Sequence, residues 1–159
     1  MTLAARLFSL AWPFALTAFV APSLAHAAAT ATAAATATAT AIESQLDCKS
    51  TPHDFIAPLQ QEGLLEKKAM RVEPNSINAF RPVKGAALTA YGFKVYALVA
   101  YQKDDPLFRQ GKGEPIGDAA YGAVVWGGDD EVQQRVREAG SDAVVHHVAP
   151  FITAIFCKP

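Results

Sequence analysis

Cysteine is scarce in this chain of 159 residues, which contains only two, Cys48 and Cys157. They do not form a Cys-x-x-Cys pair, so neither a redox-active dithiol motif nor a zinc ribbon is predicted. An even number of cysteines in a chain that leaves the cytoplasm favours a disulfide, which here would close most of the sequence into one loop. Two free thiols, or pairing between molecules, are the alternatives.

Charged residues are also few, at 18% of the sequence, and the formal net charge is −1. The two signs are interspersed and no basic stripe exists, so nucleic acid is not a predicted partner. No segment combines a basic face with an apolar face, so attachment to a membrane surface is not predicted either.

Sequence signatures of catalysis and of cofactor binding are missing. None of the serines after residue 41 lies in a Gly-x-Ser-x-Gly elbow. The stretch Gly111-Lys112-Gly113 lacks the earlier glycine and the hydroxyl residue of a P-loop. We therefore predict no cofactor, no metal and no catalytic residue, and we expect a role other than catalysis. A site assembled only in space would leave no such signature.

Two adjacent histidines, His146 and His147, lie in an apolar run near the end of the chain. Neighbouring side chains on a strand point to opposite faces, so this pair cannot share a metal ion. The pattern predicts that His146 faces the core together with Val144 and Val148, and that His147 lies on the other face. Loss of His146 is then expected to lower stability, and His147 is expected to have no role in activity.

The sequence begins with the features of a secretory signal peptide, which we assign to residues 1–27. One positive residue precedes an apolar run that ends near Val20, and the small-x-small site Ala25-His26-Ala27 follows. The run is short and interrupted by Pro13, so no stable membrane span is expected after processing; a retained anchor is the alternative. We predict a bacterial protein that is periplasmic or secreted.

Residues 28–41 consist almost entirely of Ala and Thr. Side chains this small cannot build a core that would offset the entropy of ordering the chain, so we predict a flexible spacer. Residues 42–159 carry all 15 acidic residues and all but one of the 14 basic residues. This length is sufficient for one domain with its own core.

Hydrophobic periodicity predicts an α+β fold for that domain, with two helices and a mixed sheet of about five strands closed by one disulfide. The first helix follows Thr51, and Pro58 within it is expected to divide it. The second begins at Asp129, a candidate cap, and ends at Gly140. Candidate strands occupy 68–74, 76–82, 87–102, 121–128, 142–148 and 151–157.

The connection of residues 103–118 is long, rich in Gly and Pro, and without periodicity. Long irregular connections are uncommon and often functional. Leu107, Phe108 and Arg109 combine apolar, aromatic and guanidinium groups there, and aromatic residues and Arg are frequent at binding hot spots. We predict that these residues and Lys112 contact a partner. The alternative is that Leu107 and Phe108 attach the loop to the core.

These observations favour an exported, non-enzymatic binding module, of the inhibitor or immunity type, that docks its 103–118 loop on a protein partner in the cell envelope. The second hypothesis is a small periplasmic hydrolase that uses Asp or His side chains near the same loop, such as Asp118 or His147. The third is a purely structural envelope domain.

Overall fold

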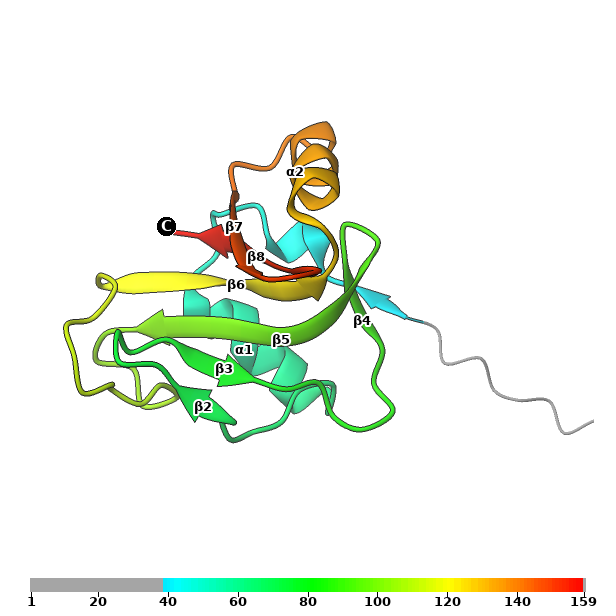
Figure 1. The fold of residues 1–159 in the computed structure, drawn as a ribbon. Helices are drawn as coiled ribbons and strands as arrows, with labels where there is room; N and C mark the ends of the chain where they lie inside the picture. The colour runs from blue at the N-terminus through cyan, green and yellow to red at the C-terminus, as the bar shows by residue number, and fades with distance from the viewer. Residues whose placement is uncertain (1–38, 159) are drawn as a thin grey trace, which may run out of the picture. The chain divides into compact units, whose positions relative to one another are not determined.

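The structure is a computed structural model that describes residues 39–158. The predicted signal peptide and most of the predicted spacer lie outside these residues. In chain order the elements are β1 (Thr40–Ala41), the 3-10 turn η1 (Glu43–Gln45), α1 (Pro52–Gln61), β2 (Arg71–Val72), β3 (Asn78–Phe80), β4 (Leu88–Ala90), β5 (Phe93–Gln102), β6 (Ala119–Trp126), α2 (Asp129–Glu138), β7 (Val144–Ala149) and β8 (Ile152–Cys157). Figure 1 shows their arrangement.

The predicted α+β class is confirmed, with two helices and a mixed sheet, but the described sheet has eight strands rather than about five. The main order is β1-β4-β5-β6-β8-β7, and the β2–β3 hairpin joins it through β5. All pairs are antiparallel except β1 with β4. The candidate strands 68–74 and 76–82 contain the short strands β2 and β3, and the candidate 87–102 is divided into β4 and β5. Only β1, which is two residues long, was not predicted. Strand β1 consists of the last two residues of the predicted spacer, so regular structure begins before residue 42.

Helix α1 begins as the sequence predicts. Thr51 is the N-cap, and its hydroxyl accepts a hydrogen bond from the backbone N–H of Asp54 at 3.1 Å. The expected division at Pro58 is wrong, because the helix continues through this residue to Gln61. Pro58 is exposed, and the missing hydrogen bond affects only one carbonyl in the first turns of the helix. Phe55, Ile56 and Leu59 form the buried stripe.

Strands β4 and β5 are joined by a two-residue turn at Tyr91-Gly92. Both residues have positive φ, at 52° and 84°. Two consecutive positive values match the twist of a hairpin, which explains the glycine. Strand β5 then bulges at Tyr96, between the pairs Val95–Val125 and Ala97–Val124. The bulge changes which side chains face the core, so core-facing and outward-facing side chains do not alternate regularly along the strand.

Helix α2 covers the predicted segment, but its N-cap is Gly128 and not Asp129. No side chain caps this end, because Gly128 has none. Val132 and Val136 are the buried residues of the helix.

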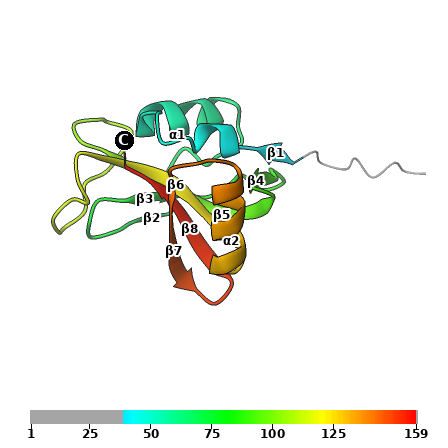
Figure 2. The same ribbon diagram turned by 90° about the horizontal axis from the view of Figure 1, so that it is seen from above.

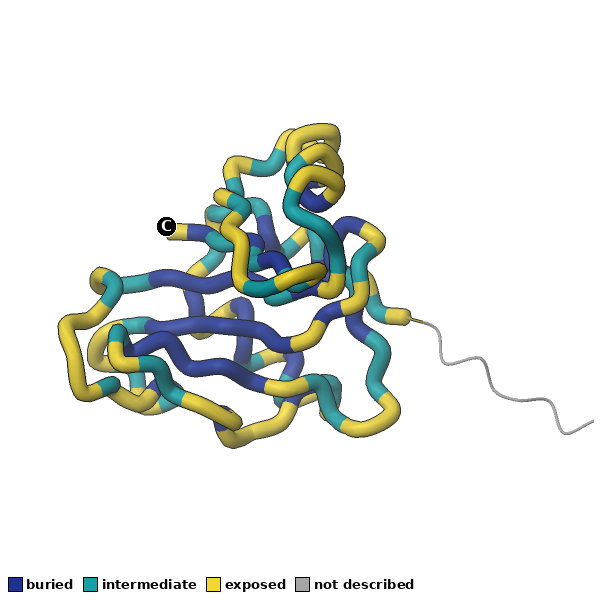
Figure 3. Tube along the Cα trace, in the orientation of Figure 1, coloured by how far each residue is buried: buried dark blue, intermediate teal, exposed yellow. Residues whose placement is uncertain are grey.

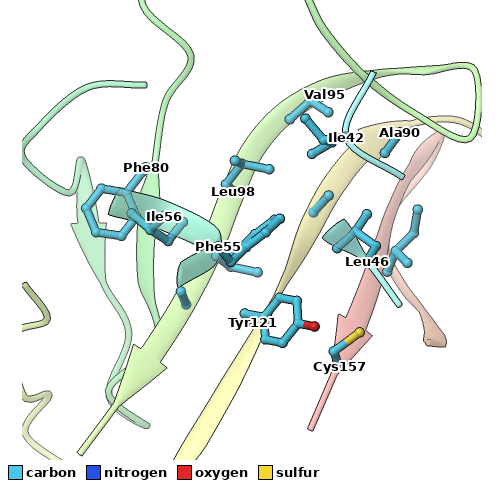
Figure 4. Packing of buried hydrophobic residues seen from close by; sticks show 14 of the residues in the cluster. Ile42, Leu46, Phe55, Ile56, Phe80, Ala90, Val95, Leu98, Tyr121 and Cys157 are labelled. Carbon is cyan, nitrogen blue, oxygen red and sulfur yellow. The ribbon is translucent and has the colours of Figure 1, made fainter. Parts of the chain in front are cut away.

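Both helices pack on one face of the sheet. The Phe55 ring of α1 lies 4.9 Å from that of Tyr121 on β6, and the start of α2 hydrogen-bonds to Thr153 on β8. Tyr121 and Thr153 lie on the same face of the sheet, in register with Cys157 and Val125. Figure 2, seen from above, shows α1 and α2 beside different parts of the sheet, and Figure 4 shows the core between α1 and strands β5, β6 and β8.

The predicted disulfide is confirmed. Cys48 and Cys157 are bonded, with Cα atoms 4.9 Å apart and a sequence separation of 109 residues. The bond joins the segment before α1 to the end of β8. Among residues 39–158, no helix is long and apolar enough to cross a membrane.

Candidate functional site

The predicted binding loop, residues 103–118, joins β5 to β6 and is attached to the rest of the domain through its own predicted binding residues. Phe108 is 7% exposed, and its ring packs edge-on against Phe80, with centroids 6.3 Å apart. The backbone N–H of Arg109 donates to Asn78 Oδ1 at 3.0 Å, and its guanidinium donates to the Ala69 carbonyl at 3.3 Å. Leu107 is partly buried, and Lys112 is exposed. These contacts match the packing alternative for Phe108; binding of a partner by the loop stays a prediction.

The second half of the loop lies against residues 73–78, the turn between β2 and β3. Gly111 N–H donates to Ser76 Oγ at 3.0 Å, and Gly113 N–H donates to the Pro74 carbonyl at 2.8 Å. A Cβ at Gly111 would lie 2.2 Å from the Glu73 carbonyl oxygen, so only glycine fits this approach. Sequence reasoning missed these contacts because the two segments are more than thirty residues apart.

Two histidines form pairs with carboxylates. His53 Nδ1 lies 2.7 Å from Asp105 Oδ2, whose side chain is only 8% exposed. The other oxygen of Asp105 accepts the Leu107 N–H at 2.8 Å. The neighbouring hollow of about 470 Å³ is lined by the start of α1 and the two ends of the loop, including Lys103 and Asp118. Neither His53 nor Asp105 lines this hollow, so the pair does not present a base to it.

The second pair joins β7 to α2. His147 Nδ1 lies 2.6 Å from Asp129 Oδ2, and the Thr153 hydroxyl lies 2.5 Å from Asp129 Oδ1. The Thr153 hydroxyl, followed by the His147 imidazole, holds the pKa of Asp129 below its ordinary value. The sequence pointed to neither partner, since both lie on strands that come later in the chain.

The expected burial of His146 is wrong. His146, Val144 and Val148 are all exposed, because the face of β7 that they share is the one without a helix. Of the two neighbours, His147 faces the helix layer, through its contact with Asp129.

The geometry offers little support for catalysis by these imidazoles. Among the described residues, no hydroxyl or thiol hydrogen-bonds to His53 or His147, the Thr153 hydroxyl contacts a carboxylate instead, and both cysteines are in the disulfide. Within residues 39–158, no group of three or more His, Cys, Asp or Glu side chains could hold a metal ion.

The sheet face opposite the helices, here called the open face, carries a different kind of site. Register places Ala79 beside Val99, and Ala97 beside Val124, on the three neighbouring strands β3, β5 and β6. These small side chains form the floor of a hollow of about 450 Å³, which we call the trough. Its apolar walls are Met70, Tyr96, Val148 and Ile152. In Figure 3 most of β3, β5 and β6 is buried, whereas most of β7 is exposed.

The trough requires the open face to be concave. Five inter-strand steps separate β2 from β7, which would be about 24 Å on a flat sheet. Arg71 on β2 and Val148 on β7 nevertheless line the same hollow. The sheet must therefore curve toward its uncovered side, as the bulge at Tyr96 favours.

The margins of the trough are aromatic on one side and charged on another. Tyr96 packs edge-on against Trp126, with centroids 5.8 Å apart, and the two residues are 39% and 48% exposed. Arg71, Glu73 and Arg81 lie on the β2–β3 side. Arg71 forms an ion pair with Glu73, whereas Arg81 forms no ion pair with any residue in the described part of the chain.

Comparisons with protein-family models, with curated proteins and with solved structures found no match to this chain. The function of the domain is therefore inferred from the site alone.

Proposed function

We propose that the domain is a non-enzymatic binding module that acts outside the cytoplasm, in the bacterial periplasm or after secretion, and that it takes an apolar ligand in the trough. The observation that carries the proposal is a concave apolar hollow on an uncovered sheet face, with exposed Tyr96 and Trp126 beside it. A hollow with apolar walls and exposed aromatic side chains beside it is a candidate ligand site. The volume falls within the range of small-molecule sites.

Two further features support the proposal. A disulfide such as Cys48–Cys157 is typical of proteins outside the reducing cytoplasm, in agreement with the predicted signal peptide. The loop that we first expected to bind a partner has its aromatic anchor, Phe108, packed inside the domain. Because Phe108 is buried, the trough and not the loop is the apolar surface that remains available to bind a ligand.

A test is available on β7, which offers a matched pair of exposed valines. Val148 lines the trough, whereas Val144, on the same strand and similarly exposed, does not. We expect the purified protein to bind the uncharged hydrophobic dye phenylnaphthylamine, with an increase in dye fluorescence. Val148→Lys should weaken this binding about tenfold, which corresponds to the loss of roughly one apolar contact.

Val144→Lys serves as the control, because it introduces the same charge on the same edge strand outside the trough. Circular dichroism would verify that both variants remain folded. Equal binding by the wild type and Val148→Lys, or equal weakening by the two variants, would contradict binding in the trough.

A further inference from the structure

The charges at the margin of the trough define which apolar ligand it would take. Apolar side chains line the β7–β8 side, where Val148 and Ile152 lie, and the charged residues of the lining are all on the β2–β3 side. A ligand that fills the trough therefore meets apolar surface along most of its length and charge at one end. This asymmetry fits an amphiphile better than a ligand that is apolar throughout.

The sign of the charge follows from the pairing of the side chains. The Arg71–Glu73 ion pair is neutral as a unit. Arg81, one residue beyond the Phe80–Leu98 pair of β3 and β5, retains its positive charge at the edge of the floor. A guanidinium without an acidic partner favours a carboxylate, which it can bind through two parallel hydrogen bonds.

We propose that the trough binds a monomeric fatty carboxylate, with the acyl chain against Tyr96, Val148 and Ile152 and the carboxylate at Arg81. This inference rests on the proposed function, since it requires the trough to bind an apolar chain. A single chain is favoured over a membrane surface because the apolar side chains line a hollow, which one chain can enter and a bilayer cannot.

The experiment compares three ten-carbon probes that share a chain and differ in the head group: decanoate, decanol and decyltrimethylammonium. Each is titrated below its critical micelle concentration into the purified protein by calorimetry, at low ionic strength, where an exposed charge is least screened. We expect decanoate to bind about tenfold more tightly than decanol, and decyltrimethylammonium more weakly than both.

Two exposed cations provide the matched variants. Arg81→Gln should reduce decanoate binding to the level of decanol and leave decanol binding unchanged. Lys94→Gln removes an exposed positive charge from β5 that does not line the trough, and it should alter neither. Glu73→Gln should strengthen decanoate binding, because it releases Arg71 from its ion pair.

The outcomes separate the two proposals. Decanol binding without preference for decanoate, or equal losses in Arg81→Gln and Lys94→Gln, would overturn the carboxylate assignment and leave the apolar trough in place. Absence of binding for all three probes would overturn both. Binding to vesicles of anionic lipid with no binding of decanoate monomers would also contradict the inference, since it would indicate a membrane surface as the ligand.

Discussion

The disulfide gives the sharpest prediction on stability. We consider replacement of both Cys48 and Cys157 by alanine, which removes the bond without placing an unpaired polar group at residue 157, where the native side chain is 1% exposed. The bond closes a loop that contains almost the whole described domain, with a sequence separation of 109 residues between the two positions. It therefore restricts the unfolded chain far more than it restricts the folded one.

The magnitude follows from loop-closure entropy. For a loop of roughly 100 residues the chain-entropy relation gives about 4.7 kcal/mol at 25 °C. Small domains have unfolding free energies of about 5–15 kcal/mol. The double variant should therefore lose between a third and nearly all of its stability, although its packing is otherwise unchanged.

The assay is urea unfolding followed by far-UV circular dichroism for the oxidised wild type, the reduced wild type and the double variant. The last two should unfold at similar, much lower urea concentrations. Their m-values should exceed that of the oxidised protein, because an unfolded chain without the crosslink exposes more surface. A stability loss below about 1 kcal/mol, or an m-value that does not rise, would refute the reasoning that the bond acts through the unfolded state.

Five further substitutions test individual residues. Gly111→Ala should cost about 1–3 kcal/mol in urea unfolding, because its Cβ meets backbone, whereas Gly113→Ala, with its closest contact at 3.1 Å, should cost less. Asp129 has a lowered pKa, caused first by the threonine hydroxyl that contacts it. Its contribution is therefore present above the unfolded value of about 3.9 and lost as pH falls through the folded value, so Asp129→Asn should destabilise at neutral pH and flatten the acid limb of a stability–pH profile. Phe108→Ala should cost about 3–5 kcal/mol if the ring is a packing residue, and a Tm near that of the wild type would instead favour a binding role. His146→Ala should change the unfolding free energy by less than about 0.5 kcal/mol, because the side chain is exposed.

The features that were predicted correctly depend on residues close together in the sequence, or on a pairing for which only one choice exists. Thr51 and Pro52 predicted the start of α1 because capping involves residues three apart. The disulfide was predictable because only two cysteines exist to pair. The strands of five or more residues were found from their β-branched and aromatic content.

What could not be predicted depends on contacts between distant segments. The burial of β5 on both faces hides its alternation, so the open face could not be recognised from the pattern. His146 was assigned to the core because valines flank it, and those valines lie on the uncovered face. The pairing of Asp129 with His147 spans 18 residues, from α2 to β7, and no periodic signal reports such a contact.

The loop of residues 103–118 and the trough are connected through the β2–β3 hairpin. The β2–β3 hairpin has strands of two and three residues, and a hairpin this short is not stable alone. Its turn is held by the loop, through the bonds from Gly111 and Gly113 to Ser76 and Pro74. The same hairpin carries Arg71 and forms the charged side of the trough. The glycines and the buried aromatic ring of the loop therefore hold one wall of the trough in place. Substitutions that disrupt these loop contacts should weaken ligand binding, although the loop does not contact the ligand.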